Sequence, residues 1–128
     1  MNFITNLLTL HNQFKVFHWQ TQKKQGSYAQ HIAFGTAYDE LGPLIDDFIE
    51  IYQGKYGVLM GRDGFNVHLD NLSDNPNSFI DEFVNYFTMN VTQGLDQQKD
   101  TDLLNIKDEM LGILNQTKYR LNRFKNER

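Results

Sequence analysis

The sequence predicts an all-α fold, a four-helix bundle with one long crossover connection. Apolar residues recur at the 3.6-residue spacing of amphipathic helices, and glycine or proline marks the ends of four such stretches. The connections between these stretches follow the order short, long, short, which is typical of a bundle with one crossover. With 128 residues the chain is below the size at which chains usually split, so we expect a single domain over residues 1–128.

The first expected helix covers residues 3–24. Gly26 would end it, and Ser27 would be the N-cap of the next helix. One face of this first helix carries apolar side chains together with two histidines: Phe3, Ile4, Leu7, His11, Phe14 and His18.

The second expected helix covers residues 28–53 and ends at Gly54. Pro43 cannot donate a hydrogen bond to the carbonyl of Asp39, so we expect a kink at 39–43 or a split into two shorter helices. The apolar stripe of this helix consists of Phe34, Tyr38, Leu41, Ile45, Phe48, Ile49 and Tyr52.

The longest connection is residues 54–77, which are rich in Gly, Asn and Asp. Pro76 and Ser78 introduce a third expected helix at 79–93, and Gly94 closes it. Its inward residues would be Ile80, Phe83, Val84, Phe87 and Val91.

Asp100 or Thr101 caps the fourth expected helix. Residues 118–128, at its end, carry a net charge of +4, whereas residues 1–117 carry −8. Cations offset the dipole at a helix C-terminus, and the acidic body argues against nucleic-acid binding. The apolar positions of the helix are Leu103, Ile106, Met110, Ile113, Leu114, Leu121 and Phe124.

The composition excludes several kinds of site and location. There is no cysteine, which rules out disulfides and thiolate metal ligands. No apolar run reaches the roughly 18 residues of a membrane helix, and MNFITNLL lacks the basic start of a signal peptide. We therefore expect a cytoplasmic protein without membrane contact.

Histidines and carboxylates on the first two helices are the candidate functional residues. On the second helix, one stripe beside the apolar face carries His31, Gly35, Asp39, Gly42, Asp46 and Glu50. Imidazole and carboxylate ligands without thiolate suit iron, manganese or zinc. The alternative is structural: a histidine on an apolar face is often a core residue with one hydrogen bond, and helix-surface acids are often solvated.

The segment FHWQTQKKQGSYAQHIAFGTAYDELGPLIDDFIE resembles the ferroxidase region of the Dps mini-ferritins. His18-Trp19, His31 and Asp46-x-x-x-Glu50 occur in that family's order. The resemblance implies a ferritin-like bundle that forms at least a two-fold dimer or a hollow dodecamer, oxidises ferrous iron and stores the product. It also implies a site between two subunits, with the histidines from one and the carboxylates from its mate.

The sequence departs from this family at Gly35, where the family usually has an aspartate, so Asp39 would have to substitute. HWQT, SYAQH, LIDDFIE and YQGKYG are also similar to an uncharacterised family of small ferritin-like proteins of tailed phages, which would place the chain in the host cytoplasm. Two hypotheses follow. One is a Dps-like ferroxidase or metal-binding oligomer, with His18, His31, Asp46, Glu50 and Asp39 as iron ligands. The other is a non-catalytic phage-encoded module that binds a host or phage protein.

Overall fold

The computed structural model describes residues 3–23, 28–73 and 75–123, and no strand occurs in these ranges. The predicted all-α class is confirmed. None of the described helices is long and apolar enough to cross a membrane. The helical elements in chain order are α1 (Phe3–Gln20), the 3₁₀ turn η1 (Thr21–Lys23), α2 (Tyr28–Tyr56), α3 (Asn77–Asn85), the π-helical η2 (Tyr86–Val91), α4 (Thr92–Gly94) and α5 (Thr101–Arg123).

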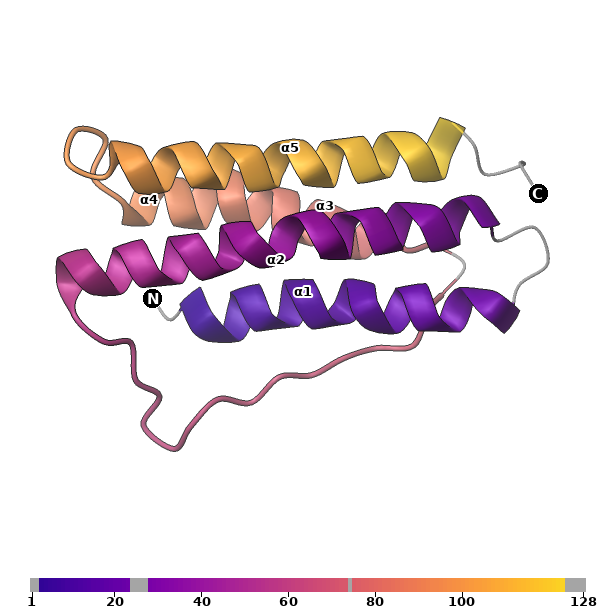
Figure 1. The fold of residues 1–128 in the computed structure, drawn as a ribbon, viewed down its shortest axis with the longest axis horizontal. Helices are drawn as coiled ribbons and strands as arrows, with labels where there is room; N and C mark the ends of the chain where they lie inside the picture. The colour runs from indigo at the N-terminus through magenta and orange to yellow at the C-terminus, as the bar shows by residue number, and fades with distance from the viewer. Residues whose placement is uncertain (1–2, 24–27, 74, 124–128) are drawn as a thin grey trace.

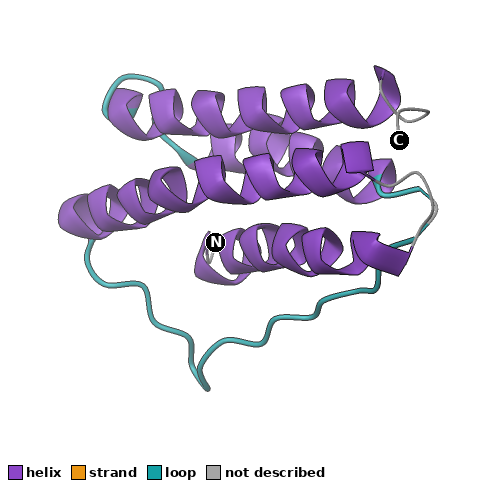
Figure 2. Ribbon diagram, turned by 45° about the vertical axis from the view of Figure 1, so that its right-hand side comes forward, coloured by secondary structure: helices purple, strands orange, loops and turns teal. Residues whose placement is uncertain are grey.

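The helices lie side by side along one long direction (Figures 1 and 2). α1 and α2 are antiparallel neighbours, and α5 lies on the other side of α2 (Figure 1). The connection after α2 carries the chain back along the molecule to the opposite end, where α3 begins. As a result α3 runs parallel to α2, and α5 returns antiparallel to both.

The second helix is longer than predicted. α2 continues three residues past the expected end and stops at Tyr56, because Gly57 is the residue with positive φ (95°). The Gly57 N–H donates to the Gln53 carbonyl at 2.8 Å, which closes the last turn as an αL cap. Pro43 lies inside this unbroken helix, so the predicted split is wrong, although the ribbon bends near its middle (Figure 1).

The third helix begins at Asn77 rather than at 79, and its centre is π-helical over Tyr86–Val91. Phe83, Phe87 and Val91 are buried on its inner side. Their i, i+4 spacing is also that of one face of a regular α-helix, so the amphipathic pattern did not indicate the π-helical turn.

The first helix is α-helical as far as Gln20 and continues as the 3₁₀ turn η1 to Lys23. The predicted end at residue 24 lies outside the described residues. The expected end and cap at Gly26 and Ser27, and the apolar Phe124, lie outside the described residues.

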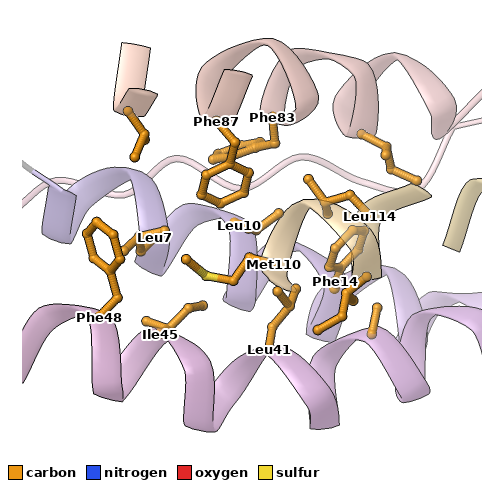
Figure 3. Packing of buried hydrophobic residues seen from close by; sticks show 14 of the residues in the cluster. Leu7, Leu10, Phe14, Leu41, Ile45, Phe48, Phe83, Phe87, Met110 and Leu114 are labelled. Atoms are coloured by element: carbon orange, nitrogen blue, oxygen red, sulfur yellow. The ribbon is translucent and has the colours of Figure 1, made fainter. Parts of the chain in front are cut away.

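The core lies between the helices and is rich in phenylalanine (Figure 3). Met110 of α5 reaches in between α1 and α2, and Leu41 and Phe87 approach it from α2 and η2 (Figure 3). The predicted inward residues are mainly correct, but His11 and His18 are only half-buried, at the edge of the core. The buried side chains of α1 are Phe3, Leu7, Leu10, Gln13, Phe14 and Phe17.

Two glutamines of α1, seven residues apart, attach the long connection to the bundle. Gln13, only 1% exposed, donates to the Asp70 carbonyl (2.8 Å) and accepts from the Asp70 N–H (2.7 Å). Gln20 accepts from the Leu72 N–H at 2.6 Å and donates to Asn71 Oδ1 at 2.8 Å. These amides satisfy backbone groups of a segment that has no helix or sheet partner of its own.

The YQGKYG motif ties the end of α2 to the start of α5. The Tyr56 hydroxyl donates to the carboxylate of Asp100, a residue that is 2% exposed, and this carboxylate also accepts from the Asp96 N–H at 2.8 Å. Lys55 Nζ lies 3.1 Å from Asp100 and 2.9 Å from Asp102. Burial raises the pKa of Asp100, but the hydrogen bonds from Tyr56, the Asp96 N–H and Lys55 outweigh burial and hold that pKa below its ordinary value.

Replacing Asp100 with Asn should lower the free energy of unfolding by about 1.5–3 kcal/mol at pH 7, because charge-assisted hydrogen bonds to a buried group are lost. The folded-state pKa of Asp100 is depressed, so its stabilisation is present above the unfolded carboxyl pKa of about 3.9 and is lost as the pH falls through the lower folded value. Urea unfolding should therefore show the difference between wild type and Asp100→Asn narrowing below about pH 4. A difference of constant size from pH 7 to pH 3 would contradict this assignment.

Candidate metal-ligating site

His18 of α1 contacts α2 through both its ring face and its ring edge. Its Nδ1 lies 2.8 Å from the His31 carbonyl oxygen. Its ring stacks on the ring of His31, with centroids 4.0 Å apart and planes 22° apart. One turn along α2, a Cβ atom at Gly35 would lie 2.8 Å from Cε1 of His18. The two helices approach closely here because residue 35 has no side chain.

His11 makes the same set of contacts seven residues earlier on α1. Its Nε2 lies 3.0 Å from the Tyr38 carbonyl oxygen, and its ring stacks on Tyr38 with centroids 4.2 Å apart and planes 5° apart. A Cβ at Gly42, four residues after Tyr38, would lie 3.4 Å from His11 Nε2. We refer to these two arrangements, each a histidine of α1 with a ring, a carbonyl and a glycine of α2, as the histidine clasps.

Gly35, the position at which this chain departs from the mini-ferritin pattern, therefore has a packing role in this chain. Any side chain there would displace the His18 ring, which its hydrogen bond and stacking hold in place. Asp39, the proposed substitute, is exposed on α2.

In the stacked pair of His18 and His31, hydrogen bonds determine which ring nitrogen of each histidine carries the proton. His31 Nδ1 lies 2.9 Å from Thr21 Oγ1 and 3.2 Å from the His18 carbonyl oxygen. A carbonyl oxygen only accepts, so the neutral His18 and His31 rings both carry their proton on Nδ1. Each Nε2 is then left with a lone pair, the state in which imidazole binds a metal ion.

The predicted carboxylate ligands lie along α2, away from this pair. Asp46 and Glu50 are exposed and line a groove of about 320 Å³ between α1 and α2. Its apolar lining is Ile4, Leu7, Leu8, Ile45 and Ile49. Within the described ranges no three His, Asp or Glu side chains come together in a metal-binding group. The structure thus joins His18 to His31, and it does not join either to Asp46, Glu50 or Asp39 within one chain.

Two residues of this face, Lys15 and Thr21, were not identified from the sequence. Lys15 Nζ lies 5.3 Å from the ring centroids of both Trp19 and Tyr38, a double cation–π contact. Thr21 is buried and contacts His31. The sequence does contain a signal for the contacts of α1, because the pattern His-x-Gln occurs at 11–13 and again at 18–20. The histidines of this repeat contact α2, and its glutamines bind the long connection.

The fold and this face define an all-helical protein with two stacked histidines between antiparallel helices and a separate carboxylate-lined groove on the same helix pair. The chain belongs to a family of unknown function, DUF5856, whose family model matches residues 18–121. The match takes in His18, His31, both carboxylates of the groove and the YQGKYG motif, and it begins seven residues after His11. No curated protein and no solved structure matches the chain significantly.

Replacing Gly35 with Ala should destabilise the fold by about 1–3 kcal/mol, since the new methyl group would press on the His18 ring. Gly112 is the matched control: it is also helical, but a Cβ there meets nothing within 4 Å. Gly112→Ala should stabilise by about 0.5–1 kcal/mol through helix propensity alone. Urea unfolding of both variants measures the difference, and equal behaviour of the two would show that residue 35 has room for a side chain.

Proposed function

We propose that this protein is a ferritin-like, Dps-type metal-binding protein that takes up ferrous iron at a site shared between two copies. His18 and His31 of one copy and Asp46 and Glu50 of its mate would be the ligands. The observation that carries the proposal is the pair of Nε2 lone pairs, kept available because both Nδ1 atoms are occupied by hydrogen bonds to the backbone. Metal-ligating histidines commonly have their second nitrogen held in this way.

The path of the chain supports the ferritin-like part of the proposal. A long connection between α2 and α3 makes these two helices parallel, while the other connections join antiparallel neighbours (Figure 1). One long crossover of this kind distinguishes ferritin-like bundles from simple up-and-down bundles.

The separation along α2 is the reason for proposing two copies. Asp46 follows His31 by fifteen residues, about 22 Å of helix, so one chain cannot close both groups around one ion. A two-fold axis passing near Tyr38, roughly midway between the two groups, would place the carboxylates of each copy opposite the histidines of the other. The apolar groove beside Asp46 and Glu50 offers surface for such a contact.

The donor set fits iron, and manganese or zinc would find the same nitrogen and oxygen ligands. Iron would be a substrate here. Two ferrous ions each give one electron to a hydrogen peroxide molecule, which takes up two protons and leaves as two waters; oxygen is the other candidate oxidant. Asp39 is the remaining candidate for the carboxylate that Gly35 does not supply.

Anaerobic titration with ferrous iron, followed through Trp19 fluorescence, tests the ligand set, because Trp19 is the single tryptophan and adjoins His18. His31→Ala and Asp46→Ala should each weaken binding at least ten-fold, since one ligand is removed. Asp47→Ala is the control, an exposed acid beside Asp46. Wild type that neither binds ferrous iron nor oxidises it faster than buffer in air would overturn the proposal.

Mixing the two inactive variants tests the shared site directly. A mixed dimer of His31→Ala and Asp46→Ala carries one intact site, formed by the unchanged histidines of one copy and the unchanged carboxylates of the other. Binding should therefore return to about one quarter of the wild-type sites after random exchange. If the mixture stays inactive while light scattering shows exchanged dimers, both ligand groups cannot belong to an inter-subunit site.

The second candidate, a non-catalytic phage-encoded module that binds a host or phage protein, is favoured by exposed apolar side chains on the long connection. Val58 and Met60 are 73% and 78% exposed there. This alternative predicts iron oxidation equal to buffer and loss of partner binding in Met60→Ser.

A further inference from the structure

We infer that Thr21 is a positioning residue: its hydroxyl holds His31 in the tautomer that carries the proton on Nδ1, and so keeps Nε2 of His31 free as a ligand. The inference rests on the proposed function for the purpose of that ligand, but the tautomer itself is a property of the metal-free protein.

The hydroxyl of Thr21 has both of its roles assigned by its neighbours. Oγ1 lies 2.8 Å from the His18 carbonyl oxygen, and a carbonyl oxygen can only accept, so the hydroxyl proton points there. Toward His31 Nδ1, at 2.9 Å, the hydroxyl then has only a lone pair to offer. A ring nitrogen facing a lone pair must donate, which places the ring proton on Nδ1.

The position of Thr21 explains why the hydroxyl stays in place. It is the first residue of η1, directly after α1, and it is 1% exposed. The His18 carbonyl belongs to the last turn of α1, where helical carbonyls lack intrahelical partners. Thr21 and His31 both donate to that carbonyl, so the helix end and the ring orientation depend on the same hydrogen bonds.

Without the hydroxyl, His31 Nδ1 would retain only the longer contact to the His18 carbonyl, at 3.2 Å. His18 is not affected in this way, since its Nδ1 bonds to the His31 carbonyl at 2.8 Å. In a variant without the hydroxyl, the tautomer of His31 is therefore the test, and the tautomer of His18 is the internal control.

Thr21→Val removes the hydroxyl at nearly constant volume, and Thr21→Ser restores it with less bulk. Nitrogen-15 spectra of the histidine rings at pH 8 report the tautomers without metal. We expect His31 to be the Nδ1–H form in wild type and in Thr21→Ser, and to gain Nε2–H form in Thr21→Val, while His18 stays Nδ1–H in all three. His31 as Nε2–H in wild type, or an unchanged His31 tautomer in a folded Thr21→Val, overturns the inference.

Ferrous iron titration of the same proteins provides the second measurement. Affinity should fall about 10–100-fold in Thr21→Val and recover in Thr21→Ser, the usual effect of losing a partner of a ligating histidine. Equal affinity of wild type and Thr21→Val also overturns the inference. Absence of iron binding by wild type instead overturns the proposed function, and the nitrogen-15 spectra still decide whether Thr21 sets the tautomer.

Discussion

The close approach of α1 and α2 at two glycines is the constraint on which the rest of this structure depends. Each approach lets an imidazole of α1 lie flat on a ring of α2 and bond to the carbonyl of the same residue. With Gly35 and Gly42 against the histidines, the phenylalanines on the inner side of α1 are brought deep into the core. A side chain at either position would separate the helices and loosen the packing that follows.

The same constraint explains the chemistry proposed for this face. The clasp at His18 and His31 uses one nitrogen of each ring for structure and leaves the other with its lone pair. In His11, the nitrogen bonded to a backbone carbonyl is Nε2 and not Nδ1, so its Nε2 is not available as a metal ligand in the same way. Only the pair near the end of α1 thus offers two Nε2 atoms, and the carboxylates lie too far along α2 to reach it within one chain.

Amphipathic spacing predicted the helical class, the four helical stretches and most of the core residues, because burial of one face requires that spacing. Helix ends were less accurate: the sequence contains two glycines at 54 and 57, and only backbone geometry shows that Gly57 has the positive φ. The π-helical turn depends on packing of Phe87 and Val91 against other helices, which no local pattern encodes. His18 and His31 were singled out as metal ligands, and the structure stacks their rings. The role of Gly35 depends on the His18 ring across from it, which the sequence alone does not show.

The His-x-Gln repeat bears on the register with which α1 packs against α2 and the long connection. Its buried residues Phe3, Leu10 and Phe17, and likewise Leu7 and Phe14, recur every seven residues. Apolar contacts alone would therefore tolerate a slide of α1 by two turns, since each hydrophobic residue would meet an equivalent site. Such a slide would place Ile4 beside the Tyr38 carbonyl, to which His11 is now hydrogen-bonded, and one clasp would be lost. The polar groups at the edge of the core thus set the register of α1. They select one alignment among several that the hydrophobic core would accept.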